Sequence, residues 1–280
     1  MLQFYMIKRD KESYFIDKIS NKFIGDDAAV VDGYIYSVDA FFEDTHFKRE
    51  WMSPRQIGRK AMLVNISDAV AMNAKPKYCL ISISIPKDMT ENDIDELIDG
   101  FNSVAKEFDC QIIGGDTIGG EKLHISITII SQSKDPLYRK GLEIGDLLAF
   151  TGSIGESKRD LEKLLFGEKI AIDSKFYEPK LRASFVAKAR EYIHVGMDIS
   201  DGLFCDTNKL LDINKYGFKI LKDINDDVGL SGEEYEMLIG FNKENKIELE
   251  KIAKSLNITL NIFAEVKNGD NRFKCYSHHF

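Results

Sequence analysis

The chain of 280 residues lacks long apolar runs and a leader of the secretory type. Its amino terminus has no apolar core followed by small residues suited to cleavage. No stretch approaches the roughly 20 apolar residues that a membrane-spanning helix needs. We therefore expect a soluble, cytoplasmic protein with no membrane partner. With 44% hydrophobic residues the chain can bury a full core, and its length suits one large or two medium domains.

Basic charge is not in excess, and paired cysteines are absent. Lys and Arg number 38 against 46 acidic residues, and the net charge of −8 argues against a general nucleic-acid surface. The cysteines form neither a C-x-x-C pair nor a cluster of zinc-finger spacing. We expect small buried thiols rather than a zinc site or a redox dithiol. The cysteines are Cys79, Cys110, Cys205 and Cys275.

Two common nucleotide-binding motifs are missing as well. The sequence contains no G-x-x-x-x-G-K-[ST] segment, and no G-x-G-x-x-G segment follows a strand. If the protein binds phosphates, it has to hold them in another way. Carboxylate-bound Mg²⁺ is such a way, because this ion prefers a few carboxylates, water and phosphate oxygens.

What the chain does have is five short aspartate-bearing segments between apolar stretches. We expect each to be a turn that holds a carboxylate at the end of a strand or the start of a helix. Any single one can be structural, because Asp is common in turns and at helix N-caps. Together they would repel one another without cations, which predicts a shared Mg²⁺ site. The segments are GDD at 25–27, SVD at 37–39, NISD at 65–68, GGDT at 114–117 and DISDG at 198–202.

The alternation of expected strands and helices, and the connection that Asp135-Pro136 marks, divide the chain into an α/β domain over residues 1–134 and a second domain over residues 135–280. Each domain is expected to contain a mixed sheet with helices on one face. One helix begins at Ser53-Pro54 and runs towards Asn65, and another follows the capping box TEND at 90–93. The remaining expected strands are 34–39, 78–86, 124–130, 146–150 and 258–263, and the remaining expected helices are 156–166, 179–192, 243–256 and one after residue 202.

The residues of the aspartate segments, and the order of the segments along the chain, resemble the motifs of the thiamine-monophosphate kinase family. Residues 60–76, KAMLVNISDAVAMNAKP, are similar to its K-A-x-x-x-N-x-S-D-x-x-A-M-G-A-x-P segment. Residues 25–29, 114–117, 139–155 and 197–203 match further family motifs in the same order. The resemblance implies the two-domain fold of the aminoimidazole ribonucleotide synthetase and selenophosphate synthetase superfamily, with an α/β amino-terminal domain and an α+β carboxyl-terminal domain. It also implies a homodimer formed through the amino-terminal sheets.

By this resemblance we expect transfer of the γ-phosphoryl group of ATP to thiamine monophosphate, which gives thiamine diphosphate and ADP. Both reactants are polyanions, so catalysis would rest on positioning and charge neutralisation, without a phosphorylated enzyme or a strong general base. The implied magnesium ligands are Asp27, Ser37, Asp39, Asp68, Asp116, Asp198 and Asp201. The implied ATP contacts are Gly115, Asp116, Arg139 and Ser200, and the implied substrate contacts are His46, Glu233 and Tyr276.

The chain also departs from the family pattern. SVDA at 37–40 replaces S-T-D-T, which leaves the number of metal ions open, and SGEE at 231–234 replaces G-G-E-D. Lys60 has two interpretations, a solvated helix lysine or a balancing charge near the metals. Two alternative functions remain: another ATP-dependent synthetase of the superfamily, and a non-catalytic nucleotide-binding relative. Against selenophosphate synthesis, the chain has no reactive Cys or Lys in a glycine-rich amino-terminal arm.

Overall fold

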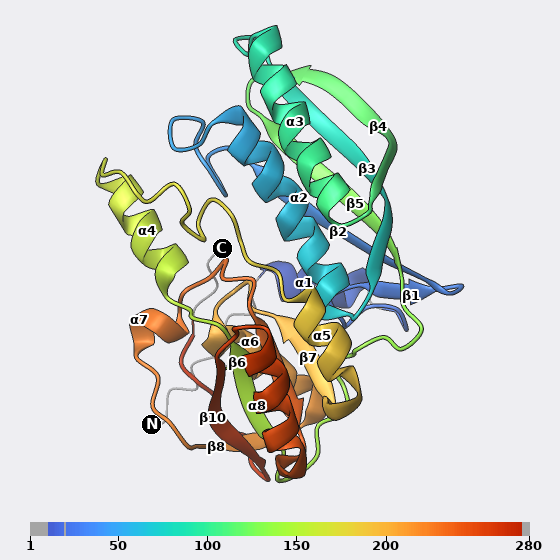
Figure 1. The fold of residues 1–280 in the computed structure, drawn as a ribbon, viewed down its shortest axis with the longest axis vertical. Coiled ribbons are helices and arrows are strands. Elements are labelled where there is room, and N and C mark those ends of the chain that lie inside the picture. Colours follow the sequence, from blue (N-terminus) through green and yellow to red (C-terminus); the bar gives the residue numbers. More distant parts are fainter. Residues whose placement is uncertain (1–10, 20, 276–280) are drawn as a thin grey trace, which may run out of the picture.

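Among residues 11–19 and 21–275, which the computed structural model describes, the strands form two five-stranded sheets (Figure 1). The first has the strand order β1-β2-β5-β3-β4; its β3–β4 pairing is parallel and its other pairings are antiparallel. It is therefore the mixed sheet that the sequence predicts. Its strands are β1 (Ala29–Val31), β2 (Tyr34–Phe42), β3 (Lys75–Pro86), β4 (Gln111–Gly120) and β5 (His124–Gln132).

The second sheet has the order β7-β9-β6-β10-β8, and its described pairings are all antiparallel. The expectation of a mixed sheet is therefore wrong for this half. The helices of this half connect strands that run in the same direction, such as β9 and β10. These two strands do not pair with each other, because the antiparallel strand β6 lies between them. The strands are β6 (Leu147–Thr151), β7 (Val195–Asp198), β8 (Gly217–Ile220), β9 (Met237–Phe241) and β10 (Leu260–Lys267).

Most of the expected helices are present in the structure. The segment expected to be helical from residue 179 becomes helical only at Ala183 and ends in a 3₁₀ turn, Arg190–Tyr192. The short helix α7 and the helix α1 are additions that the periodicity did not indicate. The helices are α1 (Lys11–Ile19), α2 (Pro54–Ala71), α3 (Glu91–Glu107), α4 (Glu156–Leu165), α5 (Ala183–Ala189), α6 (Leu203–Asn214), α7 (Asp226–Gly229) and α8 (Lys246–Ser255), with a 3₁₀ turn at Lys243–Asn245.

Helices α2 and α3 begin at the predicted caps. At α2, the Ser53 side chain accepts a hydrogen bond from the backbone N–H of Gln56 at 3.2 Å, and the Gln56 side chain accepts one from the N–H of Ser53 at 2.9 Å. Thr90 and Asp93 form the same reciprocal pair at α3. Each pair satisfies two backbone N–H groups that have no partner within the helix, which fixes where the helix starts.

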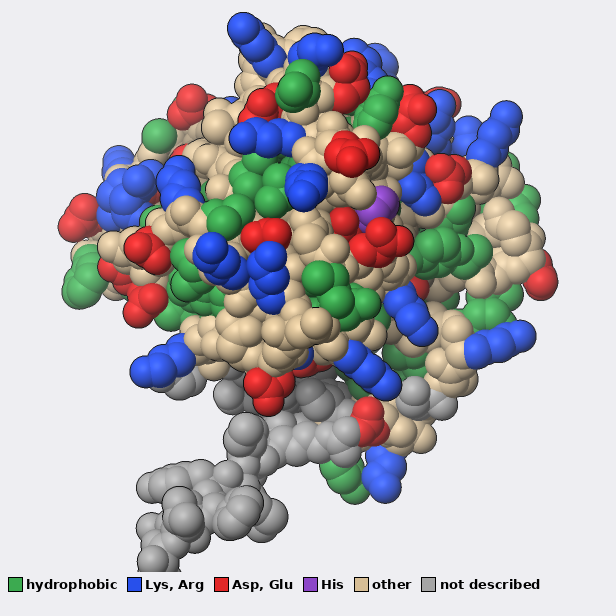
Figure 2. Space-filling view, turned by 90° about the horizontal axis from the view of Figure 1, so that it is seen from below, with side chains coloured by type: hydrophobic (Ala, Val, Ile, Leu, Met, Phe, Trp, Pro, Cys, Tyr) green, Lys and Arg blue, Asp and Glu red, His purple; other side chains and the backbone are tan. Residues whose placement is uncertain are grey.

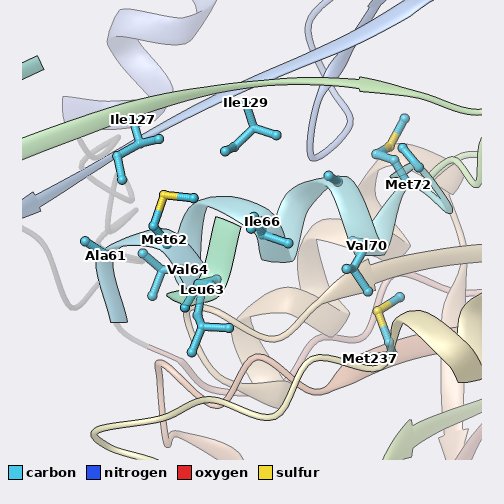
Figure 3. Close-up of a cluster of buried hydrophobic side chains, with 14 of the residues drawn as sticks. Ala61, Met62, Leu63, Val64, Ile66, Val70, Met72, Ile127, Ile129 and Met237 are labelled. Carbon is cyan, nitrogen blue, oxygen red and sulfur yellow. The ribbon is translucent and has the colours of Figure 1, made fainter. Parts of the chain in front are cut away.

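Helix α2 is buried on nearly all sides because it lies between the two sheets. In Figure 3, Met62 lies beside Ile127 of the first sheet, whereas Val70 lies towards Met237 of the second. A helix that is apolar on several faces is expected in such a central position. Side chains from both halves of the chain therefore belong to one continuous core around α2.

Three of the five aspartate segments are not turns, contrary to expectation. Residues 65–68 lie inside α2, Asp39 lies in the middle of β2, and residues 114–117 lie within β4. Helix α2 continues past Asn65 because the following residues remain apolar at helical spacing and pack on both sheets. Of the five, the segment at 25–27 lies in irregular backbone before β1, and the segment at 198–202 begins with the last residue of β7 and continues as a loop to α6.

The two faces of the first sheet differ in character. On β5, Ile125, Ile127 and Ile129 are buried on the side of α2. Alternate residues point to the opposite side, which we call the outer face. On the outer face, residues that are opposite one another on β2, β5 and β3 form two rows across the sheet. Each row contains large apolar side chains that are more than a third exposed. The rows are Tyr36, Ile130 and Tyr78, and Val38, Thr128 and Leu80.

The described part of the chain has no helix with the length and apolar character needed to span a bilayer. On the face of the molecule seen in Figure 2, basic and acidic side chains are interspersed, with apolar side chains between them. This distribution agrees with the nearly balanced numbers of basic and acidic residues in the sequence.

Candidate active site

Three carboxylates from distant parts of the chain meet beside α2. Asp27 precedes β1, Asp68 lies in the last turns of α2, and Asp198 ends β7. Each offers an oxygen atom within 4.8 Å of an oxygen from the other two. The structure thus brings together three of the seven residues that the resemblance implies as magnesium ligands.

The polar residues of α2 hold this arrangement in place. Ser67 donates a hydrogen bond to Oδ2 of Asp198 at 2.6 Å, which ties the end of β7 to the helix. Asn65 accepts a hydrogen bond from the backbone N–H of Asp39 at 2.8 Å and donates one to the carbonyl of Ala61 at 2.8 Å. The NISD segment therefore uses its amide and hydroxyl groups to fix two other carboxylate-bearing strands around Asp68.

Burial and mutual repulsion make the charged form of these groups unfavourable. Desolvation, and then the neighbouring carboxylates of Asp39, Asp198 and Asp27, raise the pKa of Asp68 well above its usual value. The pKa of Asp198 is also raised well above its usual value, by desolvation and then by Asp27. A site in which several carboxylates disfavour one another's ionisation is a site that a cation would stabilise.

Arg139 is the fixed cation of the cluster. Its Nη2 donates to Oδ1 of Asp27 at 2.6 Å, and its backbone N–H donates to Oδ1 of Asp26 at 2.7 Å. Asn214 of α6 donates to the Arg139 carbonyl at 2.8 Å. Desolvation opposes the charge of Arg139, but the attraction and hydrogen bond of Asp27, together with the attraction of Asp198 and Asp206, outweigh it and raise the pKa of the guanidinium. Arg139 therefore stays charged and joins the segment around residue 26 to the second half of the chain.

Asp201 lies just before α6, where Lys209 pairs with it. Its backbone N–H donates to Oδ2 of Asp206 at 3.0 Å. Asp206 is fully buried, and desolvation, with a smaller contribution from Asp201, raises its pKa to about 7 although Lys209 acts in the opposite direction. Sequence reasoning missed Asp206 and Lys209. The available signal was their position on one face of the helix that follows Asp201.

Asp116 and Gly115 lie on β4, the edge strand of the first sheet. Asp116 is exposed and pairs in register with Ser82 of β3. Gly115 has a φ of +154°, and a Cβ there would collide with the carbonyl of Ile81, so the close approach of the two strands requires glycine. No contact described for Asp116 among residues 11–19 and 21–275 joins it to the three clustered carboxylates, and its metal role stays a prediction.

Ser37 and Ser200 take different positions around the site. Ser37 is buried on β2, two residues before Asp39, and is opposite Ile129 of β5. Ser200 lies in the loop between β7 and α6, and its carbonyl accepts a hydrogen bond from the N–H of Glu233 at 2.7 Å. The loop that carries Asp198 is therefore bonded directly to the loop that carries an implied substrate contact.

The implied substrate residues come from both halves of the chain. Nδ1 of His46 accepts a hydrogen bond from the backbone N–H of Phe42 at 3.0 Å, so in the neutral ring the proton lies on Nε2. Glu233 has a φ of +53°, a conformation uncommon for a side chain of this kind. Its carboxylate pairs with Lys60 of α2 at 2.6 Å. Tyr276 lies outside the described residues.

The structure contradicts the first of the two interpretations of Lys60, and the second, a balancing charge near the metals, stays a prediction. Lys60 is fully buried, so it is not a solvated helix lysine. Its ion-pair partner is Glu233, an implied substrate contact rather than an implied metal ligand. Sequence reasoning could not foresee this pair because the two residues are 173 positions apart.

The departure at residues 231–234 has a structural explanation. The N-cap residue of helix α4 is Gly155, which has no side chain to cap the helix. Oε1 of Glu234 accepts hydrogen bonds from the N–H groups of Gly155 at 2.7 Å and Ser157 at 3.2 Å, and the Ser231 hydroxyl donates to the same oxygen at 2.6 Å. The longer Glu and the added Ser thus act together as a cap for α4.

The three clustered carboxylates fit a divalent cation by their chemistry. Oδ2 of Asp27 is buried and has no hydrogen-bond partner among the described residues. Burial, and then repulsion by neighbouring carboxylates, raises the pKa values of Asp68 and Asp198, which a bound cation would counteract. Carboxylate oxygens are the protein ligands that Mg²⁺ prefers.

Residues 25–132 match the family described as AIR synthase related protein, N-terminal domain. The thiamine-monophosphate kinase of Aquifex aeolicus is 30% identical over 215 residues, which cover 73% of this chain and 70% of that one. The thiamine-monophosphate kinase of Nitrosopumilus maritimus is 32% identical over 220 residues, with 72% and 71% covered.

Solved structures share the fold over nearly the whole chain. AaThiL complexed with AMPPCP and TMP superposes with a TM-score of 0.82 at 23% identity and covers 98% of this chain and 96% of that one. The hydrogenase maturation protein HypE in complex with ATP is more distant, with a TM-score of 0.69 at 18% identity and coverage of 91% and 84%. The sequence relatives and the shared fold lead to one assignment: the chain belongs to the thiamine-monophosphate kinase family.

Proposed function

We propose that the protein is a kinase that uses ATP to phosphorylate thiamine monophosphate to thiamine diphosphate. The observation that carries the proposal is the convergence of Asp27, Asp68 and Asp198 beside Arg139. Both substrates are polyanions, and a site that combines cation ligands with a fixed guanidinium can hold both. Membership of the family and the likeness of fold to AaThiL bound to AMPPCP and TMP support the same function.

The three clustered carboxylates would hold Mg²⁺, which when bound neutralises charge on the phosphates of both substrates. Arg139 binds phosphate oxygens with a guanidinium that Asp27 holds in a fixed direction. The family resemblance adds further metal ligands and ATP contacts around this centre. They are Ser37, Asp39, Asp116 and Asp201 for the metal, and Gly115, Asp116 and Ser200 for ATP.

The transfer is direct and in line. A terminal phosphate oxygen of thiamine monophosphate forms a bond to the γ-phosphorus of ATP while the bond from that phosphorus to the β–γ bridging oxygen breaks, and ADP leaves. The attacking oxygen is already ionised, so no side chain has to remove a proton. His46 and Glu233 bind the thiamine moiety, and Tyr276 is implied as its aromatic wall.

The test is incubation of the purified protein with ATP, Mg²⁺ and thiamine monophosphate, followed by chromatographic detection of thiamine diphosphate. We expect the product with the wild type and none with Asp68→Asn. Asp95→Asn, an exposed position on α3, is the matched control and should keep full activity. Binding of ATP without any thiamine diphosphate from the wild type would favour the non-catalytic alternative, and turnover of ATP with another acceptor would favour a different synthetase.

We also propose that the protein is a homodimer joined through the outer face of the first sheet. A second proposal is that the boundary between the two domains lies near residues 134–135. The support for the dimer is the two aligned rows that end in Tyr36, Tyr78, Val38 and Leu80, which leave large apolar side chains exposed. A contiguous apolar sheet face of this kind marks an association surface. The boundary is supported by the chain positions of the two sheets, whose strands lie within 29–132 and 147–267.

A further inference from the structure

Lys60 is the charged residue whose burial most needs an explanation. It lies in the second turn of α2, its side chain is 1% exposed, and its Nζ donates to Oε2 of Glu233 at 2.6 Å. A buried ammonium group without compensation is strongly unfavourable. The carboxylate of Glu233 supplies the compensation, and it reaches α2 from the other half of the chain.

Aromatic rings complete the surroundings of the ammonium group. Nζ of Lys60 lies 4.1 Å from the ring centroid of Phe176 and 5.6 Å from that of Phe41. Phe176 itself meets the ring of Trp51 at 6.2 Å. Rings at these distances attract a cation through their electron-rich faces, and they hold the lysine stem in one direction. Lys60 is therefore a rigid point of charge rather than a mobile side chain.

The same lysine lies between the two implied substrate residues. On one side, the ring of Phe41 stacks with that of His46 at 5.8 Å. On the other side, Lys60 bonds the carboxylate of Glu233, whose side chain remains 28% exposed. The Glu233 backbone is also fixed, because its N–H donates to the carbonyl of Ser200 at 2.7 Å and its carbonyl accepts from the hydroxyl of Ser157 at 2.9 Å.

We propose that Lys60 is a positioning residue for thiamine monophosphate, which acts by holding the Glu233 carboxylate in one orientation as a hydrogen-bond acceptor. The inference rests on the proposed function and deepens it. The thiamine moiety carries an amino group on its pyrimidine ring, and an oriented carboxylate accepts a hydrogen bond from such a donor. With Oε2 held by Lys60, the Glu233 side chain has one direction in which to meet the substrate. The described contacts of Lys60 are with Glu233 and two aromatic rings and with none of the implied ATP contacts, so we expect ATP binding not to depend on it.

Steady-state kinetics of Lys60→Met, Lys60→Gln and Glu233→Gln separate this role from a purely structural one. For Lys60→Met we expect the KM for thiamine monophosphate to rise about tenfold or more, since a hydrogen bond to a charged group is lost from the bound state. The KM for ATP should change by less than about twofold on the same reasoning. Lys60→Gln keeps a donor for Glu233 and should fall between Lys60→Met and the wild type. Lys106→Met, at an exposed lysine of α3, is the control.

The double variant of Lys60→Met with Glu233→Gln tests whether Lys60 acts through Glu233. If it does, the double variant has the same KM for thiamine monophosphate as Glu233→Gln alone. Additive effects, an equal rise in both KM values, or an unchanged KM in Lys60→Met would overturn the inference. If Lys60→Met does not fold, Lys60→Gln decides, and an unchanged KM there has the same consequence. A wild type that makes no thiamine diphosphate refutes the proposed function itself, which is a separate result.

Discussion

At the scale of single residues, the site is a balance of buried charges. Asp27, Asp68 and Asp198 repel one another within the core, and Arg139 is the fixed cation that pairs with one of them. The protein without metal therefore keeps unfavourable charge where the substrates are to bind. Such a site loses stability in exchange for affinity towards cations, as functional sites commonly do.

This balance predicts an unusual effect for Asp68→Asn. Removal of one repelling carboxylate should raise the melting temperature of the metal-free protein by about 2–4 °C, which corresponds to about 1 kcal/mol for a chain of this size. The same change should abolish the further rise that Mg²⁺ together with ATP gives the wild type. Differential scanning calorimetry with EDTA, and then with MgCl₂ and ATP, measures both effects. A metal-free variant less stable than the wild type would contradict the repulsion argument.

A second residue-scale prediction concerns Glu236, which is fully buried between two cations. It accepts hydrogen bonds from Lys175 at 2.7 Å, from Nε of Arg182 at 2.6 Å and from Thr151 at 2.7 Å. Glu236→Gln leaves Arg182 without its counter-charge and Lys175 with only the more distant Glu234 at 3.8 Å, and it should lower the free energy of unfolding by about 3–5 kcal/mol. Urea denaturation measures the loss.

The matched control for this prediction is Glu250→Gln. Glu250 pairs with Lys246 at 3.8 Å, and both side chains are 49% exposed. An exposed pair of this kind contributes less than about 1 kcal/mol. Equal losses in the two variants would show that burial of the Glu236 network does not determine its contribution.

At the scale of elements, the crossing of α2 and α3 depends on two glycines. A Cβ on Gly100 would lie 3.0 Å from the Cα of Gly58 and 2.9 Å from the backbone nitrogen of Arg59, and would collide with the carbonyl of Arg55. Neither helix can yield locally, because the atoms that would collide belong to the backbone. Gly100→Ala should therefore destabilise the protein by about 1–3 kcal/mol, although alanine favours a helix.

The Gly100→Ala prediction is checked by thermal and urea unfolding beside Asn102→Ala. Asn102 lies on the exposed side of α3, so its replacement should change the free energy of unfolding by less than about 0.5 kcal/mol. If Gly100→Ala were as stable as the wild type, the two helices would have room to separate and the close crossing would not be required.

Local sequence signals predicted elements well where the cause was local. The caps at Ser53 and Thr90 fixed the starts of α2 and α3, because the interacting residues are three positions apart. The NISD segment was misread as a turn, because only its packing against both sheets shows why the helix continues through Asp68. The cap of α4 by Glu234 was invisible for the same reason, since it comes from 79 residues away.

At the scale of the whole molecule, the order of the aspartate segments along the chain predicted the shared site better than the expected turns at each segment predicted its local structure. The family resemblance placed Asp27, Asp68 and Asp198 in one site, and the fold brings their oxygens within 4.8 Å of one another. The pairing of Lys60 with Glu233 could not be predicted, since it depends on how the two halves of the chain meet across α2. Periodicity describes one element at a time and carries no information on such a contact.

The outer face of the first sheet predicts the state of assembly. If two copies join through it, Leu80→Glu places a carboxylate at the β3 end of one apolar row, within the interface, and should convert the dimer to a monomer. The physical reason is the cost of burying an unpaired charge, which amounts to several kcal/mol per subunit. Size-exclusion chromatography with light scattering measures the mass directly.

A control variant shows whether the change in mass of Leu80→Glu is specific to the outer face or would follow from a charge at any exposed apolar residue. Ile247 on α8 is 66% exposed, more than Leu80 at 38%, but it lies far from the first sheet in the fold. Ile247→Glu should leave the mass of the assembly unchanged, because no apolar row surrounds it. A monomeric wild type would refute the proposed dimer. A Leu80→Glu variant that remains dimeric would place the interface on another surface, and the exposed rows would then need a different partner.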